Sequence, residues 1–386
     1  MTGPLESLRS LSSQMDLEPA EDFACARLPA SPTAGDKKDF PFISQAVLPG
    51  GKRIPLLKTL LTSACERNCF YCPFRAGRNY HRATFKPGEM ASTFMQLHQA
   101  GIAKGIFLSS GIVAGGVHTQ DQLIATAEIL RLKKHYRGYL HLKLMPGAER
   151  SQVERSMQLA DRVSVNLEAP NTRRLSLLAP RKEFLDELLQ PLRWVDEIRR
   201  NQPAYSAWNG RWPSTTTQFV VGAVGESDLE LLKTAGYLYR DLGLRRAYFS
   251  AFRPIVDTPF ENLPPESPQR ELRLYQASFL LRDYGFELED LPLDRSHQLP
   301  LNIDPKTAWA QANLLEQPLE INRADPQQLI RIPGIGPKGA RAILAARRKG
   351  RLSSVEDLKK IGVSPARALP YILLDGARPV RQLSFW

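Results

Sequence analysis

Six short apolar runs, separated by amphipathic segments, constrain the fold more than any other feature of this sequence. The runs are PLLKTLLTS (55–63), KGIFLSS (104–110), YLHLKLM (139–145), RVSVNLE (162–168), TTQFVVGAV (216–224) and RRAYFSAF (245–252). Strands that alternate with helices are typical of a parallel sheet with crossover helices. We therefore expect an α/β fold, a partial (β/α)6 barrel over residues 39–300. In such barrels the reactive residues gather at the C-terminal ends of the strands.

Three of the four cysteines follow the first run directly, as Cys65-x3-Cys69-x2-Cys72 in CERNCFYC. A cluster of this kind in a chain with few cysteines indicates ligands for a metal ion or an iron–sulfur cluster. A tetrahedral zinc ion needs four ligands, and no histidine stands at ligand spacing here. A [4Fe–4S] cluster on three thiolates would leave one iron open to an outside ligand. Cys25 stands alone, and we assign it no role.

The CxxxCxxC spacing after the first strand of a six-unit α/β barrel resembles the radical SAM superfamily. The resemblance implies that Cys65, Cys69 and Cys72 hold a [4Fe–4S] cluster whose open iron binds S-adenosylmethionine. In that family an electron cleaves the bound cofactor and a 5′-deoxyadenosyl radical is released, a chemistry that the cofactor supplies. Tyr71, directly before the third cysteine, fits the same loop.

Polar and small residues at further strand ends match the places where this family binds S-adenosylmethionine. Under the resemblance the cofactor-binding residues are Tyr71, Ser109, Ser110, Gly111, Ser164, Asn166, Glu168 and Gly222. FLSSG lacks the acidic residue of the family's GGE-type motif, so a backbone role and an ordinary turn are equal alternatives there. Residues 164, 166 and 168 alternate along a strand and so share one face. Packing would account for Gly222 equally well, and no catalytic residue is identified.

The last part of the chain is strongly basic. The whole sequence has a formal net charge of +12, and Lys and Arg outnumber Asp and Glu by 13 to 5 in residues 318–386. A basic module of this size is compatible with a nucleic-acid partner. We expect a small all-α domain over residues 319–376.

The segment INRADPQQLIRIPGIGPKGARAILAARRKG predicts two short helices joined by a hairpin. Asp325 caps the first helix, residues 333–337 turn the chain, and a second helix runs over 337–348. The pattern resembles a helix-hairpin-helix module, which grips the nucleic-acid backbone without reading sequence. The expected phosphate contacts come from Gly334, Ile335, Gly336, Lys338 and Arg341. A protein–protein or packing module is the alternative.

A weaker second copy follows the first hairpin. We expect a capping box from Ser353 to Glu356, and LKKIGVSPARALPYI resembles another hairpin that lacks one glycine. We expect this copy to complete a four-helix fold and not to be the main phosphate-binding hairpin.

The remaining segments are expected to be simple. Residues 1–38 suggest a loosely ordered lead segment and residues 301–318 a connector. No apolar stretch is long enough for a membrane span, and the N-terminus lacks a signal-peptide pattern, so we expect a cytoplasmic protein without a membrane partner.

Barrel and hairpin together resemble radical SAM proteins associated with DNA modification or repair and linked with uracil-DNA glycosylases. The resemblance spans about residues 50–350 and includes LLTSACERNCFYC, FLSSG, RVSVNLEAP, TQFVVGA and the IPGIG hairpin. It implies a radical reaction on DNA, an electron donor such as flavodoxin or ferredoxin, and a uracil-DNA glycosylase-like partner. Two alternatives stay open: a radical enzyme that modifies RNA such as transfer RNA, and a redox-sensing DNA-binding protein that does not cleave S-adenosylmethionine.

Overall fold

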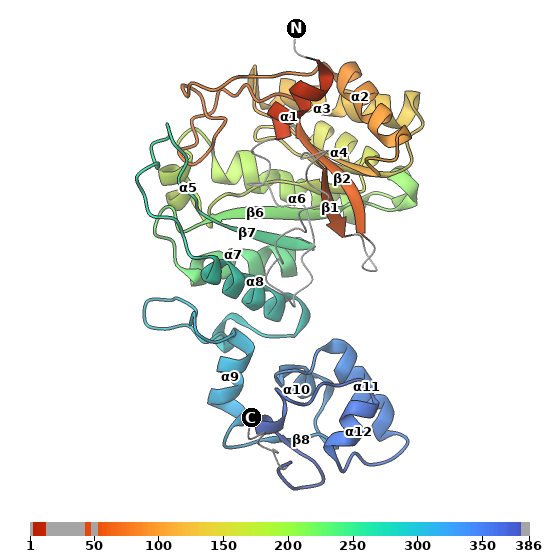
Figure 1. Ribbon diagram of the computed structural model, residues 1–386, viewed down its shortest axis with the longest axis vertical. Coiled ribbons are helices and arrows are strands. Elements are labelled where there is room, and N and C mark those ends of the chain that lie inside the picture. Colours follow the sequence, from red (N-terminus) through yellow and green to blue (C-terminus); the bar gives the residue numbers. More distant parts are fainter. Residues whose placement is uncertain (1–2, 13–42, 48–52, 380–386) are drawn as a thin grey trace. The chain divides into compact units, whose positions relative to one another are not determined.

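The chain folds into two compact units (Figure 1). The computed structural model describes residues 3–12, 43–47 and 53–379. The first unit comprises residues 1–226 and 237–266, and the second comprises 227–236 and 267–386. Helix α8 (Pro268–Asp283) belongs to the second unit.

One seven-stranded sheet forms the centre of the first unit. Its strands follow one another in the order of the sequence: β1 (Ile43–Val47), β2 (Arg53–Leu60), β3 (Gly105–Ser109), β4 (Tyr139–Lys143), β5 (Arg162–Ser164), β6 (Ser214–Val221) and β7 (Arg246–Ala251). Strands β2 to β7 pair in parallel, whereas β1 pairs antiparallel with β2. Because β1 and β7 are both edges, the sheet is a partial barrel, and the expected α/β fold class is confirmed.

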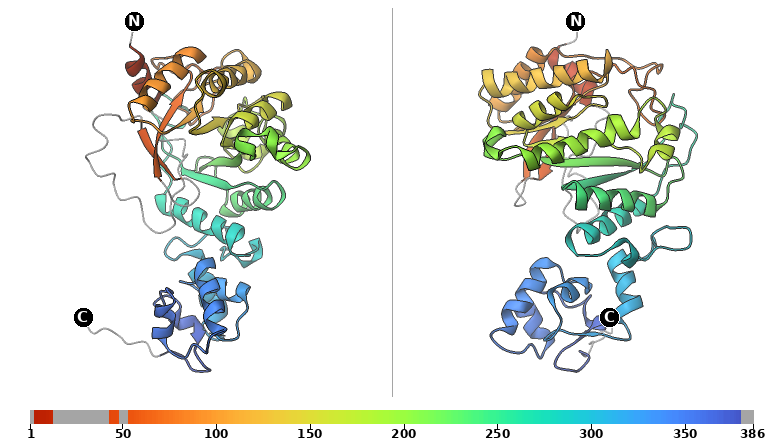
Figure 2. Two further views of the ribbon diagram at one scale, coloured as in Figure 1. Left: turned by 90° about the vertical axis from the view of Figure 1, so that its right-hand side faces the viewer. Right: turned by 180° about the vertical axis from the view of Figure 1, so that it is seen from behind.

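Helices connect the parallel strands and cover the outer face of the sheet (Figure 2). They are α2 (Pro87–Gln99), α3 (Gly115–Glu128), α4 (Arg150–Leu159), α5 (Thr172–Leu178), α6 (Gln190–Asn201) and α7 (Asp228–Asp241). A π-helical segment, Ile129–Lys133, continues α3 at its C-terminal end. A second one, Phe184–Leu189, directly precedes α6. The helices bury the outer face, and the inner face lies inside the partial barrel, which explains the nearly continuous apolar runs of the strands.

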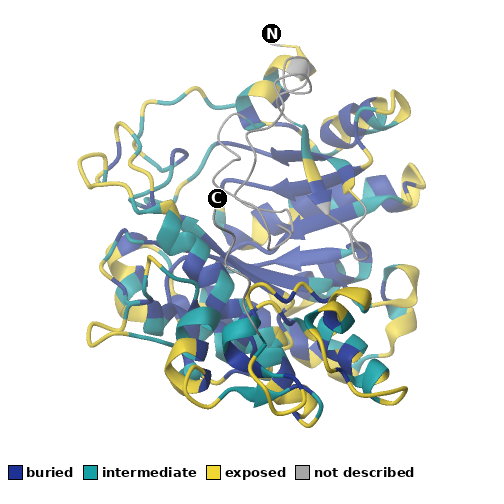
Figure 3. Cartoon of the chain, turned by 60° about the horizontal axis from the view of Figure 1, so that its bottom comes forward, coloured by how far each residue is buried: buried dark blue, intermediate teal, exposed yellow. Residues whose placement is uncertain are grey.

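The core of the first unit lies along the strands, which are buried through most of their length (Figure 3). All five residues of β3 are buried. At the N-terminus, helix α1 (Pro4–Ser12) contributes Leu8 and Leu11, both fully buried. Part of the segment expected to be loosely ordered is thus a packed helix, while Cys25 and the rest of residues 13–38 lie outside the described residues.

The second unit is mainly helical. Its described helices are α8, α9 (Pro305–Leu314), α10 (Pro326–Arg331), α11 (Pro337–Arg347) and α12 (Val355–Lys360). A short parallel pair, β8 (Leu319–Glu320) with β9 (Ile372–Leu373), joins the ends of the module that was expected to be all-α. Leu329, Ile332 and Ile343 are fully buried in its core.

Two expectations for this unit are corrected. The segment expected as a connector contains α9, because Asp304 caps a helix there: its carboxylate accepts from the Thr307 N–H at 3.1 Å. The capping box of α12 lies one residue later than expected, from Ser354 to Asp357. Among the described helices, none combines the length and apolar composition that a membrane crossing requires.

Candidate functional site

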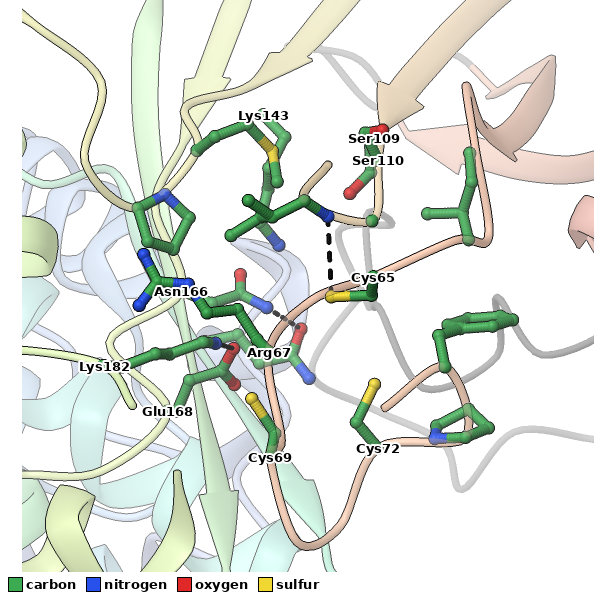
Figure 4. Close-up of a pocket in the computed structure, with 18 of the residues that line it drawn as sticks. Cys65, Arg67, Cys69, Cys72, Ser109, Ser110, Lys143, Asn166, Glu168 and Lys182 are labelled. Atoms are coloured by element: carbon green, nitrogen blue, oxygen red, sulfur yellow. Dashed lines mark hydrogen bonds and ion pairs between the residues drawn. The ribbon is translucent and has the colours of Figure 1, made fainter. Parts of the chain in front are cut away.

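A cavity of about 110 Å³ lies at the C-terminal ends of strands β2 to β6 (Figure 4). The predicted site residues that line it are Cys65, Cys69, Tyr71, Cys72, Ser109, Ser110, Gly111, Asn166 and Glu168. Lys143, Lys182, Arg67 and Gln218 line it as well. The structure therefore brings most of the predicted cofactor site to one place, at the end of the sheet where parallel barrels carry their chemistry.

The loop that follows β2 holds all three thiols at the cavity without regular secondary structure. Its backbone is fixed at both ends: the Glu66 N–H donates to the Ile112 carbonyl at 2.8 Å and the Phe70 N–H to the Leu178 carbonyl at 2.9 Å. The Cys65 Sγ accepts from the Ile112 N–H at 3.5 Å. Figure 4 shows the three sulfur atoms turned toward the same space.

The three thiols are the chemically suitable metal ligands of this cavity. Within the described ranges, no three His, Cys, Asp or Glu side chains converge on a point where one metal ion would sit. A single tetrahedral ion would need sulfur atoms about 4 Å apart. Thiolates that bind different irons of one cluster stand further apart. Three thiols on one loop that line one cavity could serve together as ligands of a metal centre.

Burial favours the protonated form of two of the thiols. It raises the pKa of Cys69 and of Cys72 above the ordinary range, and the Lys182 ammonium only partly opposes it. Metal ligands must be thiolates, so binding a cluster would replace these protons.

A buried ion pair lies beside the thiols. The Lys182 Nζ is 3.0 Å from Glu168 Oε1, and both side chains are buried. Burial alone would raise the pKa of Glu168, but the ammonium groups of Lys182 and Lys143 outweigh it and lower the pKa of this carboxyl. The Oε2 atom of Glu168 is buried and forms no hydrogen bond of ordinary geometry in the described structure, although the Tyr71 phenol lies next to this carboxylate. This oxygen can accept a hydrogen bond from a bound molecule.

Glu168 owes its place to an unusual backbone. Its φ is +64°, in the left-handed region that non-glycine residues rarely adopt. The alternating pattern had predicted residues 164, 166 and 168 on one strand. Strand β5 ends at Ser164, however, so residues 166 and 168 lie beyond it. Strained backbone of this kind often occurs at functional sites.

Tyr71 lies next to the carboxylate of Glu168. Burial, and secondarily this carboxylate, raises the pKa of Tyr71 well above its usual range, so the phenol keeps its proton. Ser110 Oγ is buried and has no hydrogen-bond partner in the described structure. Tyr71 and Ser110 thus add two hydroxyl groups to the wall of the cavity.

Gly111 brings the end of β3 against the cysteine loop. Its N–H donates to the Thr62 carbonyl at 2.7 Å, and a Cβ on residue 111 would stand 2.1 Å from the Ala64 carbonyl oxygen. A glycine is required for this close approach.

Two predicted cofactor residues do not line the cavity. The hydroxyl of Ser164 lies 2.9 Å from the His141 Nε2, inside the sheet. Gly222 has a φ of +91°, its N–H donates to Glu226, and a Cβ would meet the Glu266 side chain at 2.3 Å. Both positions are explained by packing and loop geometry.

Arg67, Lys182 and Gln218 line the cavity although the sequence analysis did not single them out. Arg67 pairs with Glu187 at 2.5 Å, and Lys182 follows helix α5 in the irregular segment APRKEF. Arg67 belongs to the cysteine loop itself, between Cys65 and Cys69, but nothing in the spacing distinguishes it from its neighbours. Lys182 lies far from the loop in the sequence, so only the tertiary fold brings it to the thiols.

The hairpin of the second unit has the geometry expected of a phosphate-binding turn. Gly334 has a φ of +83°, and Gly336 is the N-cap residue of α11. Lys338 and Arg341 lie in the first turns of this helix, and neither forms an ion pair within the described residues. N–H groups at a helix N-terminus, together with adjacent cations, favour an anion.

Comparison with known proteins supports the hairpin directly. Residues 316–366 match the family model of the helix-hairpin-helix motif. No curated protein matches the sequence of the chain.

Several solved structures share part of the backbone course. HydG, the FeFe-hydrogenase maturase of Carboxydothermus hydrogenoformans, is 16% identical with a TM-score of 0.45, over 59% of this chain and 51% of that one. Methylornithine synthase (PylB) is 13% identical with a TM-score of 0.46, over 59% and 61%. Coproporphyrinogen III oxidase (HemN) of Escherichia coli, a radical SAM enzyme, is 13% identical with a TM-score of 0.36, over 58% and 52%.

The match covers less than two thirds of each of these three chains. At these sequence identities and TM-scores, the similarity concerns only part of the path of the backbone. It assigns no activity to this chain.

Proposed function

We propose that the chain is a radical SAM enzyme that acts on nucleic acid, with DNA as the favoured substrate. The observation that carries this proposal is the cavity at the strand ends, which gathers three thiols from one loop with buried polar groups from four neighbouring strands or their ends. Cys65, Cys69 and Cys72 would hold a [4Fe–4S] cluster. When bound with S-adenosylmethionine, this cluster supplies the electron that cleaves the cofactor to a 5′-deoxyadenosyl radical.

The chain's own residues would bind and orient the cofactor. The ammonium groups of Lys143 and Lys182 lie where a carboxylate needs a counter-charge, and Glu168 can accept from an amino or hydroxyl group. Asn166 donates to the Gln218 amide oxygen at 3.3 Å, which fixes its orientation at the cavity wall.

The second unit supports a nucleic-acid substrate. Its hairpin matches the helix-hairpin-helix motif, and its basic surface suits phosphates. Contacts of this kind position a duplex and do not read bases, which favours DNA over single-stranded RNA. We propose flavodoxin or ferredoxin as the class of electron donor; no feature of the described residues identifies a uracil-DNA glycosylase-like partner.

Iron content and electron paramagnetic resonance test the metal centre. After anaerobic reconstitution we expect about four irons per chain and a signal of the reduced protein that changes when S-adenosylmethionine is added. Cys69→Ala should lose both properties, whereas the matched variant Cys25→Ala should keep them. Equal iron content in the two variants would contradict the proposed site.

A further inference from the structure

A lysine that lies outside the two helices of the motif donates a hydrogen bond to the backbone of the proposed phosphate-binding hairpin. Lys306 lies in the first turn of α9, and its Nζ donates to the Ile335 carbonyl oxygen at 2.6 Å. The ammonium group also lies 4.6 Å from the centre of the Tyr284 ring. Ile335 is the central residue of the hairpin and is fully buried.

This contact determines where the next N–H group points. The described peptide bonds include no cis bond, so the Ile335–Gly336 peptide is trans and its N–H points away from its carbonyl. With the Ile335 carbonyl fixed toward Lys306, the Gly336 N–H faces the opposite side. No backbone acceptor in the described structure takes this N–H. It is therefore available at the N-terminus of α11, next to Lys338.

The surroundings of Lys306 disfavour the protonated, positively charged form of its side chain. The lysine is half-buried, it lies at the N-terminal end of a helix dipole, and the Arg367 guanidinium lies nearby. Asp304 is the acid that faces it, but Arg367 Nη2 already donates to Asp304 Oδ2 at 2.6 Å and to Thr307 Oγ1 at 2.8 Å. The phenols of Tyr284 and Tyr371 are the other titratable groups around this cluster.

We propose that Lys306 is a positioning residue of the phosphate site: its ammonium group holds the Ile335–Gly336 peptide so that the Gly336 N–H faces the bound phosphate, and nucleic-acid binding is strongest when Lys306 is protonated. This inference rests on the proposed nucleic-acid binding by the hairpin. A bound phosphate would stabilise the ammonium form of Lys306, since it places a negative charge beside the same hairpin.

The protonation of Lys306 changes in the physiological range. Burial, together with Arg367, lowers the pKa of Lys306 to about 7. A neutral amine forms a weaker hydrogen bond to the carbonyl and no longer attracts phosphate. Binding is then linked to proton uptake above this pH, and the linkage costs up to about tenfold in affinity per pH unit.

The test is the affinity of the full-length chain for a short labelled DNA duplex, measured by fluorescence anisotropy at constant ionic strength. Between about pH 6 and about pH 8 we expect the wild-type affinity to fall roughly tenfold. Lys306→Arg keeps a permanent charge, so it should bind well with a much smaller change. Lys306→Met should bind about tenfold more weakly than the wild type at the lower pH and should also show little change.

Lys349→Met is the matched control, because Lys349 is an exposed lysine of the same unit, beyond the end of α11. It should weaken binding by the same factor at both pH values. Histidines titrate in this range too, so the readout is the difference in pH response between the wild type and Lys306→Arg. If Lys306→Met lowers the melting temperature, its weaker binding could come from unfolding. The pH response of Lys306→Arg then decides whether Lys306 has the proposed role.

The outcomes are distinct. A Lys306→Arg variant with the wild-type pH response, or a folded Lys306→Met variant that binds like the wild type at about pH 6, would overturn the role of Lys306 and leave DNA binding intact. If the wild type binds no duplex at either pH, the proposed nucleic-acid function itself fails.

Discussion

Gly111 lies at the point where strand β3 meets the cysteine loop, and it leaves no room for a side chain. We predict that Gly111→Ala destabilises the fold by about 1–3 kcal/mol, because its Cβ would stand 2.1 Å from the Ala64 carbonyl oxygen. The displaced loop should also retain less iron after reconstitution. Thermal unfolding and iron content check this prediction.

Gly88→Ala is the control for this substitution. Gly88 lies in α2, and a Cβ there would meet nothing within 4 Å. Its melting temperature should stay the same or rise slightly, since alanine favours a helix over glycine. Equal melting temperatures and iron contents for the two variants would argue against the close approach of β3 and the loop.

The ion pair between Lys182 and Glu168 is a second feature of single residues. Lys182→Met leaves the carboxylate of Glu168 buried beside the thiols with its nearest cation removed. We expect a loss of about 3 kcal/mol in the free energy of unfolding, measured by urea denaturation. The exposed pair of Lys359 and Glu356 gives the comparison, and Lys359→Met should cost less than about 1 kcal/mol.

The double variant Lys182→Met/Glu168→Gln removes both charges. It should recover part of the stability that Lys182→Met loses, because no buried carboxylate remains. No recovery would show that the loss comes from packing and not from the unpaired charge.

Single residues also show where sequence reasoning about the site ends. Spacing alone brought out Cys65, Cys69 and Cys72, since all three belong to one loop. Ser164 and Glu168 share a face in an ideal strand, but the strand ends at Ser164 and the backbone turns left-handed at Glu168. Alternation along a strand cannot predict such a turn, so Ser164 was placed in the cavity although it contacts His141.

At the scale of elements, long periodic segments were predictable and short or capped ones were not. The six parallel strands were expected near their observed places because buried parallel strands are continuous apolar runs. Strand β1 was missed, since ISQAV is short and polar at two of its five positions. Helix α9 was taken for a connector, although Asp304 and Pro305 form a typical helix start.

The hairpin between α10 and α11 makes its own prediction. Gly334→Ala should weaken duplex binding roughly tenfold, because a φ of +83° costs alanine about 1–2 kcal/mol and its Cβ would lie 3.2 Å from the Arg367 side chain. Anisotropy titrations check this expectation.

Gly350→Ala is the matched glycine substitution in the same unit. It meets nothing within 4 Å and needs no left-handed backbone. Its affinity for duplex DNA should stay near the wild-type value, and a Gly334→Ala variant that also binds normally would contradict the role of the hairpin.

The whole molecule joins two units with different chemistry in one chain. The first unit gathers three thiols and buried polar groups at the end of a partial barrel. The second carries a helix-hairpin-helix motif on a basic surface. The second unit also includes residues 227–236, which contain the start of α7 (Asp228–Asp241), a division that the hydrophobic pattern of the sequence does not mark.

The most direct test of the central claim is the release of 5′-deoxyadenosine by the reduced, reconstituted protein. We expect release from S-adenosylmethionine that requires Cys65, Cys69 and Cys72 and that rises more with duplex DNA than with single-stranded DNA or RNA. Lys338→Glu should reduce the stimulation by duplex without abolishing the basal release, since Lys338 lies at the hairpin and not at the thiols. An intact cluster and tight DNA binding without any release would contradict the account and indicate a redox-sensing DNA-binding protein instead.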